Sequence, residues 1–295
     1  QCAKLMEDLF LQATFPEGVL QNLFIDHNKI KWVIESPHIA AITLTGSETA
    51  GSKIGEIAGR NIKKTVLELG GSDPFIVLED ANVKEAARTA VRARMINCGQ
   101  SCIAAKRFIV METVFSDFVK EYVDELLQLK MGDPTDASVD IGPMARQDLA
   151  DNLEKQVKES MRLGAQALIG GGKPHGAAGA FFNPTLLVKV RPGMPVFDQE
   201  VFGPVASVIT AKTVNEAIEL ANKTKYGLGA SIWTTDTEKA LRLARQIQAG
   251  SVFINEMVVS HPGLPFGGIK QSGFGRELGE FGIKEFTNVK TIVVK

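Results

Sequence analysis

Residues 97–102, with the sequence NCGQSC, hold two of the three cysteines of the chain. They follow a helical pattern and precede an apolar strand pattern that begins at Arg107, so a break at the glycine would expose a thiol. Glu68 closes another apolar strand pattern just before Gly70 and Gly71, and α/β sheets present ligands at the carboxyl ends of their strands. A thiol with a carboxylate base could attack an electrophilic carbon and then activate water to release the acyl group.

Both residues also have an ordinary structural interpretation. A cysteine on its own is more often a small buried hydrophobic residue, and a glutamate at a strand end is more often a plain surface charge. No histidine offers a protease-like alternative, because all four lie in loop patterns without HExxH or triad-like surroundings: His27, His38, His175 and His261. Cys102 with Glu68 is therefore the better candidate pair.

Two further segments have the features of a cofactor cleft. Residues 46–51, GSETAG, follow a strand pattern and open a helix, where backbone amides and the helix dipole can hold a phosphate. Their spacing is not G-x-G-x-x-G, and a helix N-cap by Thr45 or Ser47 is a sufficient structural explanation. Glu200 and Phe202 stand two apart at a strand entry, so both could face one cleft, although a salt-bridged glutamate and a core phenylalanine are the alternative.

The elements that would position these residues alternate along the chain. Short apolar runs and helical patterns predict an α/β fold with parallel sheets covered by helices. The expected strands are 40–44, 65–69, 74–78, 107–110, 205–210, 230–234 and 251–255. The expected helices are 5–13, 47–59, 83–95, 114–127, 213–222 and 236–248. The strand at 40–44 should be buried, residues 170–179 should form a surface hairpin or loop, and residues 205–255 should form a second α/β unit.

Composition limits the partners. The 295 residues carry 33 basic and 34 acidic side chains, a formal net charge of -1, so no overall field attracts nucleic acid or an anionic membrane. No apolar run approaches the roughly 20 residues of a membrane helix. The three cysteines form no paired CxxC units, so we expect no metal site, no structural disulfide and a reducing compartment, the cytoplasm. Small molecules and other copies of the chain are the expected partners.

The two ends suggest a piece of an assembly. The chain opens on Gln1 inside a helical pattern, without a start methionine, so we interpret it as a fragment of a longer parent protein. Residues 286–295 alternate like a strand and are followed by no further element. A terminal strand of this kind invites pairing with another chain.

Four motifs in this order resemble the aldehyde dehydrogenase superfamily, and the match runs from Gln1 to Lys295. They are LELGGSDPFIV at 67–77, NCGQSC at 97–102, EVFGPV at 200–205 and PFGGIKQSGFGRE at 265–277. The 34 residues (102 − 68) between the acid and the thiol also match the family spacing.

The resemblance implies an aldehyde dehydrogenase-like α/β fold and a role for each matched residue. Cys102 would form a thiohemiacetal and then a thioester, with its backbone N–H as half of the oxyanion site, and Glu68 would activate the hydrolytic water. The cofactor would be NAD or NADP, because no side chain here accepts hydride. The implied cofactor contacts are Gly46, Ser47 and Gly51 at the pyrophosphate, Leu69 and Phe202 at the nicotinamide, and Glu200 at the ribose.

The resemblance also divides the chain. Residues 1–69 would be the remaining half of a Rossmann-type cofactor domain, 70–275 the catalytic domain, and 276–295 a C-terminal segment with an oligomerisation strand for a dimer or tetramer. In the family, an oxyanion asparagine and an adenosine-ribose lysine precede the point that corresponds to Gln1. The choice between NAD and NADP therefore stays open.

Segments 131–134 (MGDP) and 141–146 (IGPMAR) resemble the succinate-semialdehyde dehydrogenase branch. Members that hold a substrate carboxylate often have an arginine six residues before the nucleophile, where this chain has Ile96. Ser260, Arg94 or the missing part could supply that contact instead. Cys98 is a second departure, and its i, i+4 spacing from Cys102 suggests a reversible disulfide.

Three readings remain open on these grounds. The first is a fragment of an aldehyde dehydrogenase, acting on succinic semialdehyde or on aliphatic aldehydes in general. The second is a non-catalytic structural or interaction module that keeps the fold. The third is a thiol-dependent esterase or acyl transferase that needs only Cys102 and Glu68.

Overall fold

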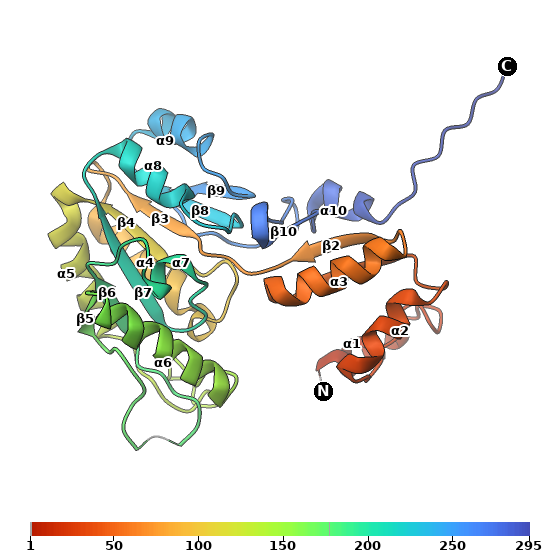
Figure 1. The fold of residues 1–295 in the computed structure, drawn as a ribbon, viewed down its shortest axis with the longest axis horizontal. Coiled ribbons are helices and arrows are strands. Elements are labelled where there is room, and N and C mark those ends of the chain that lie inside the picture. Colours follow the sequence, from red (N-terminus) through yellow and green to blue (C-terminus); the bar gives the residue numbers. More distant parts are fainter. Residues whose placement is uncertain (1, 177) are drawn as a thin grey trace.

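The computed structural model describes residues 2–176 and 178–295 as two sheets with their helices. The larger body holds the middle of the chain, and a thinner lobe holds both ends (Figure 1). The chain leaves the lobe after β2 (Lys64–Glu68) and returns to it before β10 (Gly273–Phe274). The two ends of the sequence thus form one structural unit.

The larger body is built on a seven-stranded sheet in the order β5-β6-β7-β4-β3-β8-β9. Only β5 is antiparallel to its neighbour. Its strands are β3 (Pro74–Val77), β4 (Arg107–Met111), β5 (Gln166–Ile169), β6 (Thr185–Val188), β7 (Val205–Ala211), β8 (Gly229–Trp233) and β9 (Ser251–Ile254). All residues of the central strands β3 and β4 are buried, which explains their continuous apolar sequence.

Helices cover this sheet as expected for parallel strands. The helices α4 and α5 pack on each other and on β3 and β4, while α8 contacts β3, β4 and β7. The helices of the body are α4 (Val83–Met95), α5 (Phe115–Leu126), α6 (Gln147–Arg162), α7 (Pro195–Asp198), α8 (Val214–Asn222) and α9 (Thr237–Ala244). Asn82, Thr213 and Asp236 cap α4, α8 and α9 through their side chains.

The lobe has a three-stranded sheet in the order β1-β2-β10. The strand β1 (Ala41–Thr45) is parallel to β2, and β10 is antiparallel to it, with Gly273 opposite Glu68. The helices are α1 (Cys2–Gln12), α2 (Ile30–Glu35), α3 (Glu48–Arg60) and α10 (Gly279–Glu285). The helix α3 packs on β1 and β2. It begins beside the end of β2, where the N–H of Gly46 donates to the backbone oxygen of Glu68, so its N-terminus faces the larger body.

The α/β class is confirmed, and the expected helices and strands up to β4 are confirmed within three residues. The segment 170–179, apart from residue 177, connects the antiparallel strands β5 and β6 and so belongs to a hairpin. Among the described residues, seven α-helices and strands were missed: α2, α6, α7, α10, β5, β6 and β10. The helix α6 was missed because its buried face is not uniformly apolar: Gln156 and Ser160 lie on it together with Leu153 and Val157.

Two expectations were wrong. Residues 205–255 do not form a second α/β unit, because β7 pairs with β4 while β8 pairs with β3, so they extend the same sheet on both sides. The strand β1 is not buried but alternates between half-buried and exposed residues. Its position at the edge of a three-stranded sheet leaves one face thinly covered, and α1 likewise buries none of its residues. The domain boundaries stay a prediction, with β10 placed in the smaller sheet.

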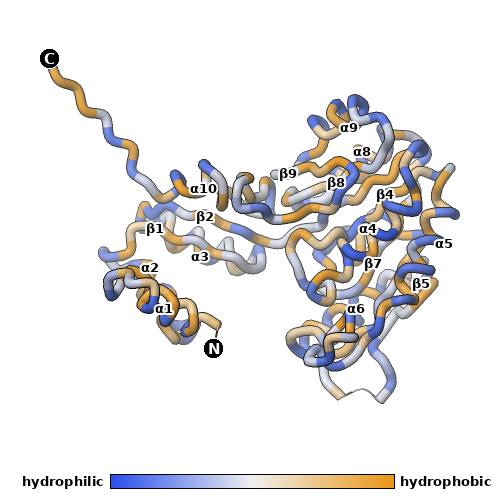
Figure 2. The backbone as a smooth tube through the Cα atoms, turned by 180° about the vertical axis from the view of Figure 1, so that it is seen from behind, coloured by the Kyte–Doolittle hydropathy of each residue, from blue (hydrophilic) through white to orange (hydrophobic). Residues whose placement is uncertain are grey.

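The tail forms no strand among residues 286–295. It runs away from the lobe, and its last part is apolar (Figure 2). Val289, Ile292, Val293 and Val294 are between 78% and 93% exposed. A strand needs a hydrogen-bonded neighbour, so pairing of this segment with another chain stays a prediction. No helix of the described residues is long and apolar enough to cross a membrane.

Deleting residues 286–295 should leave the protein monomeric, because the deletion removes an exposed apolar segment that pairs with no strand among the described residues. Sedimentation velocity measures the change. Deleting residues 294–295 alone is the control and should leave the assembly largely intact. An unchanged assembly after the longer deletion would exclude the tail as an oligomerisation strand.

Candidate active site

A cleft of about 890 Å³ lies between the lobe and the larger body. Its walls come from the end of β1 and start of α3, the end of β2, the loop that holds Cys102, helix α6, and the segments around Glu200 and Tyr226. Seven of the nine predicted site residues line it together: Gly46, Ser47, Glu68, Leu69, Cys102, Glu200 and Phe202. Residues remote in sequence therefore meet at one surface.

The loop that carries Cys102 begins with an abrupt break in α4. After Met95, a short 3-10 turn (Ile96–Gly99) follows, and Asn97, Cys98 and Gly99 all have positive φ, at 50°, 54° and 70°. A Cβ at Gly99 would lie 2.2 Å from the carbonyl oxygen of Gly203, so the backbones approach too closely for any other residue. Gly99, the glycine at which a break was expected to expose a thiol, thus ends the helical segment and allows this close approach to Gly203.

Arg94 stabilises the close approach of the Gly99 and Gly203 backbones. Its side chain is fully buried and donates hydrogen bonds to the backbone oxygens of Gly99 and Val201. Because its guanidinium is committed to these carbonyls inside the core, Arg94 does not reach the cleft. The suggestion that it could bind a substrate carboxylate is therefore wrong.

The two thiols of the loop differ in environment. Cys102 is half-buried and lines the cleft, whereas Cys98 belongs to the hydrophobic core. Burial raises the pKa of Cys98 to about 11. Burial also raises the pKa of Cys102, but the Lys106 ammonium and the backbone N–H of Ile103 oppose that rise. Cys102 is the accessible nucleophile, and Cys98 has a core position that disfavours the proposed disulfide.

Glu68 provides a carboxyl group with unusual proton affinity. It is only 4% exposed, and neither carboxyl oxygen has a hydrogen-bond partner among the described residues. Burial, reinforced by nearby Glu277 and opposed by Arg276, raises its pKa to about 8. A carboxyl group tuned near neutral pH suits a general base.

The glycine-rich motif at 265–277 makes room for that carboxyl group. A Cβ on Gly267 would lie 2.8 Å from Oε1 of Glu68. Gly273, at φ 113°, pairs with Glu68 across β2 and β10, and its missing Cβ avoids the backbone of Leu67. The motif therefore builds the wall behind the base.

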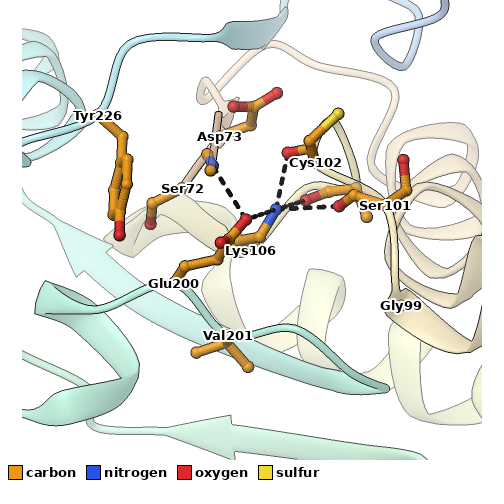
Figure 3. A network of polar contacts seen from close by, with 12 residues as sticks. Ser72, Asp73, Gly99, Ser101, Cys102, Lys106, Glu200, Val201 and Tyr226 are labelled. Atoms are coloured by element: carbon orange, nitrogen blue, oxygen red, sulfur yellow. Dashed lines mark hydrogen bonds and ion pairs between the residues drawn. The ribbon is translucent and has the colours of Figure 1, made fainter. Parts of the chain in front are cut away.

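Glu200 both faces the cleft and takes part in an ion pair, as its two interpretations predicted. It lines the cleft, and its Oε1 accepts a hydrogen bond from the N–H of Gly71 at 2.9 Å and lies 3.8 Å from Nζ of Lys106 (Figure 3). A Cβ on Gly70 would lie 2.5 Å from Oε2 of Glu200, so this glycine leaves space for the carboxylate. Phe202 lines the cleft beside it and is not a core residue.

The turn at the N-terminus of α3 divides the predicted phosphate residues. Ser47 is the N-cap and accepts a hydrogen bond from the N–H of Ala50 at 3.2 Å, while Gly46 lines the cleft. Gly51 is buried instead, and a Cβ there would lie 2.5 Å from the Leu69 side chain. Gly51 therefore lets α3 pack on Leu69 and does not line the cleft itself.

Ser260 does not line the cleft with Cys102. It is exposed in the loop after β9. Ile96, by contrast, is 46% exposed at the start of the nucleophile loop. Contact between Ser260 and a substrate stays a prediction that this geometry does not support.

Sequence reasoning missed several polar residues at the cleft. Oε1 of Glu48 accepts a hydrogen bond from the Tyr226 hydroxyl at 2.7 Å and pairs with Lys225 at 2.7 Å. Lys106 and Asp73 are buried beneath the nucleophile loop. Lys106 could have been found, because two successive basic residues at the start of an apolar strand must both find buried partners.

The profile described as the aldehyde dehydrogenase family matches residues 1–292. The chain therefore belongs to the aldehyde dehydrogenase family.

The relatives include succinate-semialdehyde dehydrogenases and another aldehyde dehydrogenase. Succinate-semialdehyde dehydrogenase [NADP(+)] 1 of Mycobacterium bovis is 47% identical over 292 residues, which are 99% of this chain and 64% of the relative. Succinic semialdehyde dehydrogenase from Streptococcus pyogenes, solved with NADP⁺, has a TM-score of 0.96 and 38% identity, over 99% of this chain and 64% of that one. An aldehyde dehydrogenase of Mycobacterium tuberculosis solved with NAD⁺ has a TM-score of 0.93 and 33% identity, over 97% and 59%. The chain thus spans less than two thirds of their lengths.

The Glu68→Gln variant should be more stable than the wild type at pH 9 and equally stable at pH 5. The raised pKa means that between about 4.5 and 8 the native state keeps a proton that the unfolded chain has released. The free energy of unfolding of the wild type therefore falls as the pH rises through this window. The neutral amide escapes that loss.

Thermal unfolding of both proteins measures the effect, with an expected gain in Tm of at least about 2 °C at pH 9. Glu56→Gln, on the exposed side of α3 and paired with Arg60, is the matched control and should show no such gain. Equal Tm differences at pH 5 and pH 9 would contradict a proton held by buried Glu68.

Proposed function

We propose that this chain carries the nucleophile and the general base of an NADP-dependent aldehyde dehydrogenase that oxidises succinic semialdehyde to succinate. The observation that carries the proposal is the meeting of Cys102 and Glu68 in one cleft, with the thiol on the larger body and the carboxyl group on the lobe. Sequence separation alone would not place them together.

The chemistry follows from the two side chains. The Cys102 thiolate adds to the aldehyde carbon, and the oxygen that becomes negative lies near the backbone N–H of Cys102. A dinucleotide held by Ser47, Glu200 and Phe202 would supply the acceptor for the hydride that leaves this carbon. Cys102 then holds the acyl group as a thioester. Glu68 removes a proton from the attacking water, and the thiolate leaves as the carboxylic acid forms.

The residues present fit a dinucleotide. The N-terminus of the 13-residue helix α3 opens on the cleft through Gly46 and the capping Ser47, which suits a phosphate. Leu69 and Phe202 offer apolar surface, and Glu200 offers a carboxylate for a ribose hydroxyl. Glu48, in the first turn of α3, would repel a phosphate, but its pairing with Lys225 offsets that charge. The preference for NADP rests on the names of the relatives.

The substrate rests on the same relatives. Among the described residues that line the cleft, Lys225 is the only lysine or arginine. Glu48 already pairs with it. A succinic semialdehyde carboxylate needs a cation or a hydroxyl donor. We propose that this partner belongs to the part of the parent protein outside these 295 residues.

Assembly and location complete the proposal. We propose a dimer or tetramer joined through residues 286–295, because this exposed apolar tail pairs with no strand among the described residues. A reducing compartment such as the cytoplasm suits a protein with three free cysteines, one of them a nucleophile.

In the parent protein, Cys102→Ala should lower the rate of NADP reduction with succinic semialdehyde by at least about a thousandfold, because it removes the nucleophile. Cys98→Ala is the matched control and should keep most of the rate, since Cys98 lies in the core.

Butanal, of similar length but uncharged, should be a poorer substrate by kcat/KM. A better rate with butanal would replace the semialdehyde by general aliphatic aldehydes. Ester hydrolysis without any NADP reduction would favour the thiol esterase.

Glu68→Gln should slow hydrolysis of the thioester by about a hundredfold or more while leaving its formation fast, because only water activation is lost. Stopped-flow absorbance at 340 nm would then record a burst of reduced cofactor followed by slow turnover. A first turnover as slow as the later ones would instead make Glu68 the base that activates the thiol.

A further inference from the structure

Lys106 is a fully buried lysine beneath the nucleophile loop. Its Nζ donates to the backbone oxygens of Cys102 at 2.8 Å, Ala104 at 3.0 Å and Ser101 at 3.2 Å (Figure 3). An ammonium has three N–H donors, and three carbonyl groups of the loop use them. The loop is therefore wrapped around one cation.

The Cys102 carbonyl is confined from a second side. A Cβ on Gly71 would lie 2.6 Å from that oxygen, so the Gly71 backbone packs directly on it. The N–H of Gly71 in turn binds Glu200, which also pairs with Lys106. Lys106, Gly71 and Glu200 thus form one contact network around the backbone of the nucleophile.

Two carboxylates balance the buried ammonium. Glu200 approaches it from the cleft side, and Asp73, whose Oδ1 accepts a hydrogen bond from the N–H of Gly229, lies on the core side. Oδ2 of Asp73 has no hydrogen-bond partner among the described residues. Burial lowers the pKa of Lys106 to about 8, while the carboxylates of Glu200 and Asp73 favour its charged form. A buried lysine is tolerated only with such partners.

We propose that Lys106 is the positioning residue of the nucleophile: it fixes the backbone of Cys102 and supplies the positive charge that favours the thiolate. The proposal rests on the proposed function only in taking Cys102 as the nucleophile. Because Lys106 acts through backbone oxygens and through space, it touches neither substrate nor cofactor.

The charges that face the thiol have opposite effects. Lys106, at the entry of β4, favours the Cys102 thiolate, whereas Asp73, before β3, and Glu200, after α7, disfavour it. Removing the lysine should therefore lower thiol reactivity. Removing either carboxylate should raise it at pH 7, below the pKa of Lys106, where the lysine keeps its charge. A purely structural network would lose reactivity in all three cases, or change in none.

Alkylation by iodoacetamide measures this without substrate or cofactor. The rate at Cys102 is followed by peptide mass spectrometry between pH 6 and pH 10, with the exposed Cys2 in the same molecule as internal standard. Lys106→Met should slow alkylation of Cys102 about tenfold at pH 7.5, which corresponds to one unit in the pKa of the thiol. Asp73→Asn and Glu200→Gln should each accelerate it at pH 7, where Lys106 is still protonated.

Lys63→Met is the matched control, because Lys63 donates to the backbone oxygens of Ile34 and Ser36 in the lobe. It should leave the Cys102 profile unchanged. Unchanged or faster alkylation in Lys106→Met, or slower alkylation in the Asp73 and Glu200 variants at pH 7, overturns the proposal.

Thermal unfolding identifies any variant that fails to fold. If Lys106→Met does not fold, the two carboxylate variants decide, and Glu200→Gln at the cleft edge decides if Asp73→Asn also fails. If the parent protein oxidises no aldehyde but the alkylation rates change as predicted, the proposed function is refuted and the role of Lys106 stands. If the parent protein oxidises aldehyde but the alkylation rates do not change as predicted, only the positioning role is refuted.

Discussion

Buried cations bound to backbone oxygens hold the irregular segments of this protein in place. A loop inside a fold must pair its carbonyl groups, because an unpaired buried polar group is costly. Lys106 binds three carbonyls of the nucleophile loop, and Arg94 binds Gly99 and Val201. Arg107 binds the carbonyls of Ser72, Leu220 and Ala221. The loops that lack regular secondary structure are thus ordered by side chains from the adjacent strand and helix.

This arrangement separates the two reactive groups by origin. The thiol comes from the larger body, where the left-handed turn at 97–99 and Arg94 direct the chain across the backbone of Gly203. The carboxyl group of Glu68 comes from the lobe, where pairing of β10 with β2 places glycines against it. The chain passes between these two units twice, once after β2 and once before β10. The geometry of the cleft therefore depends on the pairing of β10 with β2, which joins the two ends of the chain.

The same burial has different consequences for each ionisable group. Glu68 has no hydrogen-bond partner among the described residues, and burial raises its pKa into the range of a neutral-pH base. Cys98, deep in the core, has its pKa raised beyond use as a nucleophile, whereas Cys102 has Lys106 to oppose that effect. Two cysteines four positions apart thereby acquire distinct chemistry from their surroundings.

The sequence by itself determined the α/β class, most helices and strands, and the candidate pair of Cys102 and Glu68, because periodicity and strand-end position are local features. It did not determine that β7 and β8 join opposite sides of one sheet, that β1 is only partly buried, or that Arg94 serves the core while Gly51 packs on Leu69. Those outcomes depend on which surfaces meet. Lys106 gives the clearest physical reason: its partners are backbone oxygens, which every residue carries, so no side-chain pattern announces them before the loop is folded around it.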